Sequence, residues 1–427
     1  MADTQRNVEA AKTRLDSISL PYGGWTAEAR AAALARLQSQ GLPGRRDEYW
    51  RYTRPDTLTA ATAPTAVPEQ HDEDGVFDHL DALKIVFVDG VFDPQASDDL
   101  RLEGITLERL AATAEFDIHW AKPIYGILEM AGQTPVARPL ASFNTAQARD
   151  GVLIDVKSTP SRPVSVIYRH KDANSDVTLH HVVKVGEGAT FELLESGAAA
   201  ARFNHVLEVD IADRGQFHHV RAQGPDLGCQ LVTHLFTRLG TESVFKSFTL
   251  GANGLLTRNE CVIELTGDDA VAHVAGAAIG DGDFHHDDTV FITHDALRCE
   301  SRQVFKKVLR NGAVGVFQGK ILVKKDAQKT DGYQISQSLL LDGDSQFLAK
   351  PELEIYADDV VCSHGSTSGA IDEDALFYLR ARGVPVDVAT DLLTLAFLAE
   401  ALHEIESDSL SSAVGECLEV WLAQRRS

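Results

Sequence analysis

The sequence predicts a mainly β protein with helical segments at both ends, and three observations predict it. From Gly151 to about Thr367 the chain consists almost entirely of short segments in which apolar and polar residues alternate, such as VLIDV, VSVIY and HVLEVDI. This period of two is typical of half-buried strands. No helix-length pattern separates these segments, which argues against an α/β sheet. The residues before about 60 and after about 372 instead show the apolar spacing of helices.

The strand region is long for a single β-sandwich. A solenoid of rungs, each too thin to bury its own apolar face, fits this length better than a barrel or a pair of sandwiches. Turn residues such as Gly188-Ala189, Asp269-Ala270 and Gly312-Ala313 punctuate the strands, but their spacing is irregular and defines no repeat. The pattern therefore favours a β-helix-like solenoid and leaves the other two arrangements open.

The chain before the strand region is expected to be mostly helical. Thr26 and Gly41 bracket an Ala-rich stretch with a helical start and stop. The following GLPGRRDEYWRYT, residues 41–53, is a charged and aromatic patch that we interpret as a capping cluster at a domain edge rather than a ligand site. Further expectations are a polar linker over 60–80, a short buried strand over 84–90 and a helix over 105–130.

Three helices are expected after the strands. The segment from Asp372 to Gly383 has acidic residues in its first turn, arginines in its last turn and a glycine stop. Helical apolar spacing predicts two more helices, over 385–403 and around Trp421, and we expect the helices to cover the last rung of the solenoid. The predicted domains are a mostly helical 1–140 with a linker, a β core over 141–367 and a helical domain over 368–427.

Composition excludes several classes of function. The 427 residues carry a formal charge of -23, from 63 acidic and 40 basic residues, which argues against nucleic acid or an anionic membrane as a partner. Five cysteines without a CxxC pair indicate a reduced, cytoplasmic protein rather than a disulfide framework. The N-terminus has no apolar signal region, and no apolar run approaches the length of a membrane span.

Signatures of common enzymes are absent. The segment from Gly315 to Ile321 superficially resembles a phosphate-binding loop, but Val314 stands where that loop needs glycine and Ile321 where it needs Ser or Thr. The sequence also lacks GxSxG, HExxH and a GxGxxG after a strand. We therefore expect no ATP site on this chain.

Histidines are abundant and several are adjacent. Neighbours on a strand face opposite sides, so a pair cannot easily chelate one ion, and we interpret His180-His181 and His218-His219 as surface residues. The HHDD at 285–288 sits in what we expect to be a Gly/Asp-rich loop, either a divalent-ion site or a solvated turn. Cys229, Cys261 and Cys299 are expected to be small core residues.

Cys362 and His364 are the candidate metal ligands. They follow the alternating strand KPELEIYA, and if the extended run continues they face the same way. A thiolate and an imidazole on one face can hold a soft or borderline metal. Two ligands do not close a four-coordinate site, so the others must come from elsewhere. The alternative is that both side chains are simply buried.

Six long stretches, spread over most of the chain, carry a family resemblance. They are GLPGRRDEYWRYT (41–53), FNTAQARDG (143–151), VFQGKILVKKDAQKTDGYQ (316–334), SLLL (338–341), KPELEIYADDVVCSHGSTSG (350–369) and LFYLRARG (376–383). Together they resemble the SufD family, scaffold subunits of the SUF iron–sulfur cluster assembly machinery. The related SufB family shares the AQKTD and LFYLRxRG elements, whereas CSHG and GLPxRRxExW are similar to SufD.

The resemblance implies a right-handed parallel β-helix core capped by N- and C-terminal helical domains. It also implies a non-catalytic scaffold that pairs with a SufB-like subunit through the β-helices and binds a SufC-like ABC ATPase through its C-terminal helices. A transient Fe–S cluster would be shared with the partner subunit, and persulfide sulfur would reach chiefly SufB. The cluster type, homodimer formation in isolation and flavin association in the complex stay open.

The resemblance also assigns site residues. His364 matches the histidine contributed to the subunit interface where the nascent cluster forms, and Cys362 matches a nearby family cysteine whose role is open. Asp358 and Asp359 either hold iron, orient the imidazole or mark a solvated strand end. The ATPase-contact candidates, which equally fit packing of the helical cap on the β-helix, are Phe377, Tyr378, Arg380 and Arg382.

Two rival functions come from other classes. One is a structural homodimer or interaction protein whose Cys362 and His364 are buried. The other is a β-helix enzyme acting on polysaccharide, which the cytoplasmic character and the few aromatic residues disfavour.

Overall fold

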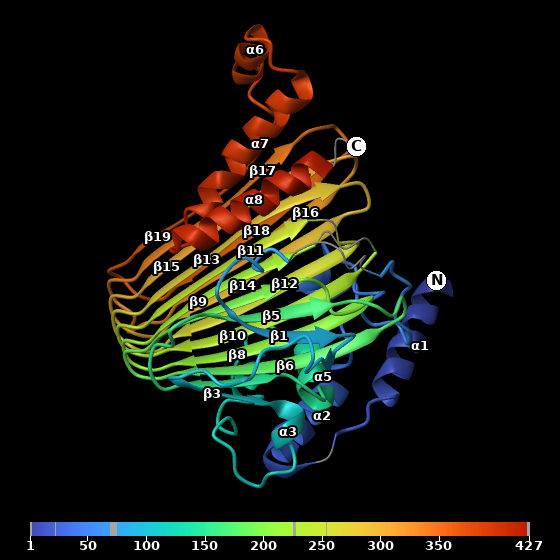
Figure 1. Ribbon diagram of the computed structural model, residues 1–427, viewed down its shortest axis with the longest axis vertical. Helices are drawn as coiled ribbons and strands as arrows, with labels where there is room; N and C mark the ends of the chain where they lie inside the picture. The colour runs from blue at the N-terminus through green and yellow to red at the C-terminus, as the bar shows by residue number, and fades with distance from the viewer. Residues whose placement is uncertain (1, 22, 69–74, 225–227, 253, 425–427) are drawn as a thin grey trace.

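The protein is built around a parallel β-helix. The computed structural model describes residues 2–21, 23–68, 75–224, 228–252 and 254–424. Consecutive strands from β4 on alternate between two sheets, and every pairing among β4–β19 is parallel. Figure 1 shows these strands stacked along the molecule, with the N-terminal helices beside one end and the C-terminal helices crossing the sheet at the other. The architecture confirms the solenoid and excludes the barrel and the sandwich pair.

The first sheet has one strand more than the second. The ten-stranded first sheet holds β1 (Leu83–Val88), β2 (Val91–Phe92), β5 (Val164–Arg169), β7 (Thr190–Ser196), β9 (Gln216–Gln223), β11 (Val244–Ala252), β13 (Val271–Asp281), β15 (Glu300–Arg310), β17 (Asp331–Leu340) and β19 (Val361–Gly369). The nine-stranded second sheet holds β3 (Ile105–Arg109), β4 (Val152–Val156), β6 (Asp176–Val185), β8 (Arg202–Ile211), β10 (Gln230–Leu239), β12 (Leu256–Leu265), β14 (His285–His294), β16 (Val314–Val323) and β18 (Gln346–Ile355). Antiparallel pairing joins β1 to β2 and β3 to β4 at the N-terminal end.

Helices flank the sheets on both sides. They are α1 (Ala2–Asp16), α2 (Ala27–Gln40), α3 (Leu110–Thr113), α4 (Ile127–Ala131), α5 (Pro139–Gln147), α6 (Glu373–Ala381), α7 (Val386–Leu402) and α8 (Asp408–Gln424), with short 3-10 helices at Gly24–Thr26 and Glu48–Trp50. The expected terminal helices and the strand over 84–90 are confirmed. The helix over 105–130 is wrong in part, because residues 105–109 pair with β4 as strand β3 and tertiary pairing overrides their helical pattern. The linker expected over 60–80 lies partly outside the described residues.

Apolar side chains fill the space between the sheets. Phe191, Phe217 and Phe245 stack from rung to rung with ring centroids 6.1 and 5.9 Å apart. Isolated rungs cannot bury such rings, but stacked rungs share one continuous core. Cys261 and Cys299 lie in this core and Cys229 is buried in a smaller cluster, as expected.

One series of turns forms a ladder along the axis of the β-helix. Arg214, Glu242, Asp269 and Arg298 each have a positive φ between 54° and 59°. Each donates its backbone N–H to a carbonyl in the turn of the next rung, at 2.8–3.0 Å. The last step runs from Lys329 N to the carbonyl of Asp359 at 2.5 Å. The left-handed conformation therefore recurs because it aims one N–H along the stack.

The N-terminal segment covers the outer face of the second sheet. Trp50 is buried with the Arg258 guanidinium 4.2 Å from its ring. The Tyr49 hydroxyl bonds to Glu352 of β18, and the Lys350 ammonium lies 3.9 Å from the Tyr49 ring. Tyr49 and Trp50 thus pack on the face of the second sheet rather than at a domain edge, whereas residues 44–48 of the patch are exposed.

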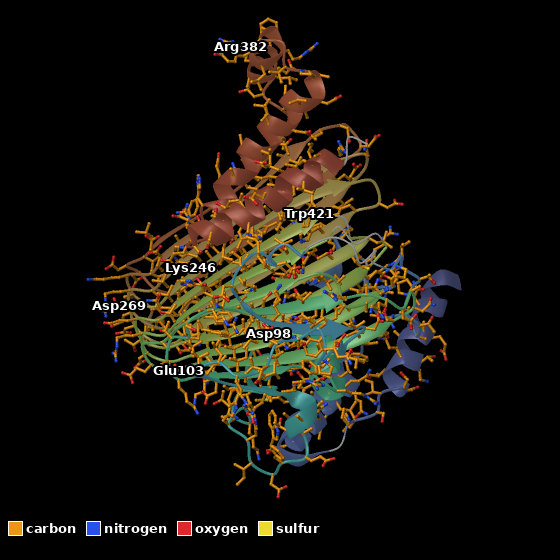
Figure 2. All side chains as sticks on the ribbon, in the orientation of Figure 1. Asp98, Glu103, Lys246, Asp269, Arg382 and Trp421 are labelled. Atoms are coloured by element: carbon orange, nitrogen blue, oxygen red, sulfur yellow. The ribbon has the colours of Figure 1, made fainter. Side chains whose placement is uncertain are left out.

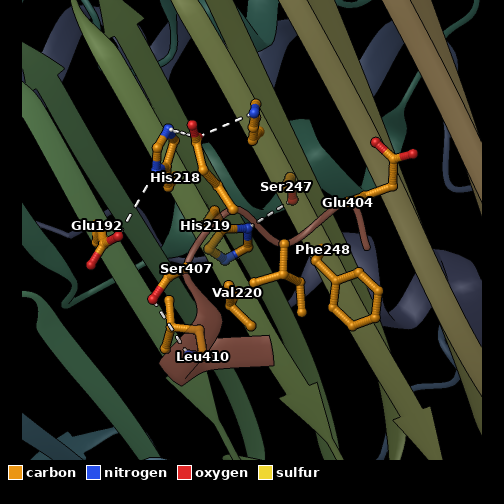
Figure 3. Close-up of a pocket in the computed structure, with 12 residues that line it drawn as sticks. Glu192, His218, His219, Val220, Ser247, Phe248, Glu404, Ser407 and Leu410 are labelled. Carbon is orange, nitrogen blue, oxygen red and sulfur yellow. Dashed lines mark hydrogen bonds and ion pairs between the residues drawn. The ribbon is translucent and has the colours of Figure 1, made fainter. Parts of the chain in front are cut away.

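The C-terminal helices lie on the outer face of the first sheet. Leu398, Leu410 and Trp421 pack there against apolar residues of β9, β11, β13 and β15. Figure 3 shows the adjoining pocket, where Glu406 lies 3.1 Å from both His218 Nε2 and Lys246 Nζ. The expectation that these helices cover the last rung is wrong: they bind the face of the sheet, whose apolar residues need burial, and leave β19 open.

Candidate functional site

The β-helix ends in an open rung. Strand β18 pairs on one side with β16, and β19 on one side with β17. No residue of either strand is fully buried. Both sheets therefore end in an edge whose backbone N–H and C=O groups can pair with another strand.

Cys362 and His364 lie on β19, on the side facing the interior. Cys362 is in register with Gly332 of β17, and a side-chain carbon built on Gly332 would lie 3.2 Å from Cys362 Sγ. Farther along the same side, Ser366 Oγ lies 2.9 Å from Ser336 Oγ. Alternate residues of β19 thus share one face, which confirms that Cys362 and His364 point the same way.

The two candidate ligands differ in exposure. Cys362 is half-buried beside Ile321 and Leu353, and burial raises the pKa of its thiol. The His364 side chain is exposed, and no described residue hydrogen-bonds to its imidazole. Burial of His364 within the chain itself is therefore excluded, whereas burial of both side chains between two chains stays a prediction. The pair offers one thiol and one free imidazole toward the open rung.

Asp358 and Asp359 occupy the turn between β18 and β19. Both residues are exposed. The Asp359 backbone is the last step of the turn ladder, and its N–H donates to Gln328 Oε1 at 2.9 Å. The hydrogen bonds of the Asp359 backbone account for the position of this turn. Binding of iron by the Asp358 and Asp359 carboxylates stays a prediction.

Helix α6 projects from the body as an arm, visible at the top of Figure 1 and with Arg382 at its tip in Figure 2. Asp372 caps its N-terminus by accepting from Asp374 N and Ala375 N. Phe377 is 74% exposed and Tyr378 55% exposed, with the Arg382 guanidinium 3.4 Å from the Tyr378 ring. Arg380 is also exposed. None of these four side chains packs on the β-helix, so the packing alternative is wrong.

The interpretation of the first two histidine pairs as surface residues is also wrong. His180, His181 and His219 are buried, and His218 is half-buried beneath the segment after α7. The hydroxyl of Tyr168 donates to Glu195 Oε1 at 2.5 Å, and His219 Nε2 lies 2.7 Å from Glu195 Oε2. The sequence signal that could have revealed this interior network is the placement of polar residues at inward-facing positions of otherwise apolar strands.

Within that network, His181, Glu195 and His205 have the spacing of metal ligands. Val152 N–H donates to His181 Nδ1 at 2.7 Å, and the Arg221 guanidinium donates to His205 Nδ1 at 3.1 Å. Each neutral imidazole therefore carries its proton on Nε2, the nitrogen that faces the group, and has no lone pair left there. Arg221 also places a positive charge beside the carboxylate. The group is a hydrogen-bond network rather than a cation site.

The HHDD segment is not in a loop but in strand β14. Asp287 bonds to the Arg258 guanidinium on the outer side, and Asp288 Oδ2 accepts from Lys307 Nζ at 2.6 Å on the inner side. Burial would raise the pKa of Asp288, but Lys307 and His286 hold it below its usual value. Because the two carboxylates face opposite sides and each has a cationic partner, they do not form a common ion site.

A parallel β-helix with an open last rung that carries Cys362 and His364, and with an exposed helical arm, defines a β-helical protein with two surfaces that can bind other chains. The family described as "SUF system FeS cluster assembly, SufBD core domain" matches residues 168–397, so the chain belongs to the SufBD family of iron–sulfur cluster assembly proteins.

Two relatives named iron-sulfur cluster assembly protein SufD are similar to this chain. The Escherichia coli protein is 28% identical over 401 residues, covering 89% of each chain. The Bacillus subtilis protein is 26% identical over 267 residues, covering 60% of each chain. A SufBD family protein of Synechocystis is 25% identical over 414 residues, covering 91% of this chain and 89% of its own. Among the described residues, no helix is both long enough and apolar enough to cross a membrane.

Proposed function

We propose that this protein is the non-catalytic SufD-type scaffold of a SUF complex, in which a nascent Fe–S cluster forms as cargo at the open rung. The observation that carries the proposal is the position of Cys362 and His364 on the edge strand β19, facing the interior at the open end of the β-helix. A thiolate and an imidazole are suitable ligands for iron. Together they supply two ligands, and a four-coordinate site needs two more. A second chain docked on this rung supplies the rest.

The partner surface is formed by the two free strand edges. Strands β18 and β19 end their sheets side by side, so a second β-helix can continue both sheets through backbone hydrogen bonds. A SufB-like subunit is the proposed occupant, and a second copy of this chain is the alternative when no SufB-like chain is present. Cluster binding then requires the thiolate form of Cys362, so the thiol must lose its proton. In the isolated chain, burial raises the pKa of this thiol and so favours its protonated form.

The arm formed by α6 is the proposed docking point for a SufC-like ATPase. Exposed aromatic side chains next to arginines are typical of protein-binding hot spots. ATP binding on the partner would move the arm and shift the interface between closed and open populations. The five cysteines form no disulfide in the structure, which fits a reducing, cytoplasmic setting, and flavin association in the complex is left to experiment.

Replacing the proposed imidazole ligand tests the function. In His364→Ala the fold is expected to be unchanged, because the side chain is exposed, while the iron and acid-labile sulfide bound by the anaerobically assembled complex fall severalfold. Thr367→Ala is the matched control, since Thr367 lies on the same strand but faces the other way. Normal iron and sulfide content in His364→Ala, with complex assembly confirmed by size-exclusion chromatography, would contradict the proposal.

Removing an aromatic side chain from the arm tests the ATPase contact. Phe377→Ala is expected to weaken binding of the SufC-like partner by at least about tenfold, as loss of a hot-spot aromatic does, without changing thermal stability. Val420→Ala on α8 removes another exposed apolar side chain and should leave the affinity unchanged. Calorimetric titration of the full chain with the ATPase measures both. Equal affinities for the two variants would exclude the arm as the docking point.

A further inference from the structure

Two buried glutamines lie behind the open rung without hydrogen-bond partners. Gln303 on β15 and Gln334 on β17 are both 0% exposed. In each amide, neither Oε1 nor Nε2 has a partner in the structure. An unsatisfied buried polar group costs about 1–3 kcal/mol, so the presence of two buried amides without partners needs a reason.

The two amides form a row with the candidate ligand. Gln303 pairs in register with Gln334, and Gln334 pairs in register with His364. Such in-register side chains do meet on this face, because the next pair along these strands, Ser336 and Ser366, is hydrogen-bonded through its hydroxyls. Gln334 is therefore the polar side chain directly behind His364.

The opposite sheet leaves room for the Gln334 amide. Gly319 of β16 faces it, and a side-chain carbon built there would lie 2.3 Å from Gln334 Nε2. Any larger residue at this position would collide with the amide. Gly319 thus leaves the space in the interior that the long Gln334 side chain occupies.

An imidazole that binds a metal through one nitrogen needs its other N–H to be held by an acceptor, because this fixes both the tautomer and the ring orientation. No described residue bonds to the His364 ring, and the acceptor Oε1 of Gln334 is unpaired one strand away. We propose that Gln334 is a positioning residue for His364, whose amide oxygen accepts one ring N–H and leaves the other nitrogen as a lone pair toward the open rung. The ligand role of His364 rests on the proposed function, whereas the hydrogen bond does not.

The hydrogen bond is tested by the tautomer of His364 in the full chain. In protein labelled with ¹⁵N-histidine and kept in mildly alkaline buffer, the His364 ring is expected to show one fixed tautomer. Gln334→Met keeps the length of the side chain and removes the acceptor, and should give the mixture of tautomers of a free imidazole. Gln334→Glu restores an acceptor and should restore the fixed tautomer. Gln303→Met, one rung farther back, is the matched control and should leave it unchanged.

A fixed tautomer that survives Gln334→Met, or is lost equally in Gln303→Met, would overturn the proposal. A second readout is binding of Co²⁺ alone to the full chain, which Gln334→Met should weaken by about 10–100-fold, as removal of a partner behind a ligand does. If the tautomer follows Gln334 but His364→Ala leaves cluster formation unchanged, the positioning role stands and the proposed function fails. If neither the tautomer nor Co²⁺ binding follows Gln334, the positioning role fails and the proposed function is untouched.

Discussion

Acidification is expected to unfold this protein steeply as the pH falls from about 6.5 to about 4. The cause is its buried histidines: burial lowers the pKa of His205, His234 and His294 to about 4. In the unfolded chain the same groups take up protons near pH 6.5. The unfolded state then binds more protons than the folded state, so the free energy of unfolding decreases as the pH falls.

The size of the effect follows from the shifts. A pKa lowered by about 2.5 units corresponds to about 3 kcal/mol per group at the acid end of the window. The stability is fully present above about pH 6.5 and is lost as the pH falls through the folded-state values. Glu208 acts with the opposite sign: burial raises its pKa to about 8, so its contribution grows as the pH falls from about 8 to its ordinary value. Burial also raises the pKa of Glu129 and Asp176, but the buried histidines with a lowered pKa outnumber these three carboxyl groups.

Urea unfolding at a series of pH values measures the effect. His234→Leu removes one titrating group whose two ring nitrogens have no partners, and should make the loss of stability with acid visibly shallower. His79→Leu, at an exposed position, is the control and should leave the pH dependence unchanged. Identical pH profiles for His234→Leu and the unaltered protein would contradict this account.

Truncation of Glu195 is expected to be the most damaging single substitution in the interior. Its carboxylate accepts from Tyr168 and Arg221, and it lies 2.7 Å from His219 Nε2 and 3.1 Å from His205 Nε2. Burial opposes its charge, but Arg221 and the hydrogen bonds hold the pKa of Glu195 well below its usual value. Glu195→Ala leaves the Arg221 charge buried and unpaired, which costs about 3–5 kcal/mol.

The matched control for this prediction is an exposed pair on the same β-helix. Glu187 pairs with Arg214 at the surface, where both side chains are more than half exposed. Glu187→Ala should change the free energy of unfolding by no more than about 0.5–1 kcal/mol, because exposed ion pairs contribute little. Denaturant midpoints at neutral pH compare the two variants. Similar midpoints would show that the interior network does not stabilise the fold.

The fold could be predicted well because its signals are local. Alternation along each strand and the absence of helices between strands indicated a mainly β protein. The length of the strand region favoured a solenoid but left a barrel and a pair of sandwiches open, and the family resemblance then implied a parallel β-helix. The strand β3 was missed because its helical pattern is overridden by pairing with β4, a contact between segments far apart in the sequence. Likewise, the histidine pairs looked like surface residues, because polar residues at inward-facing positions are recognised only once the inward face of each strand is known.

The candidate site was only half visible in the sequence. The spacing of Cys362 and His364 predicted a shared face, since the period of a strand is two. The alignment of Gln334 with His364 was not predictable, because register between β17 and β19 depends on the length and conformation of the turn that ends at Asp359. The exposure of Phe377 depended on where α7 docks, which no local pattern determines.

The docking of α7 anchors the C-terminal helices on the first sheet and leaves the arm projecting beyond the last rung. The anchor of α7 lies on β13 and β15. There the Lys306 ammonium pairs with Glu400 and lies 4.4 Å from the Phe397 ring. Next to it, Arg302 Nε donates to Glu404 Oε1 at 2.7 Å. Strand β19 lies between the arm and the anchored part of α7, and none of its residues is buried. A small torque on α6 would therefore be taken up by bending at the last rung before it could disturb the anchored strands behind it.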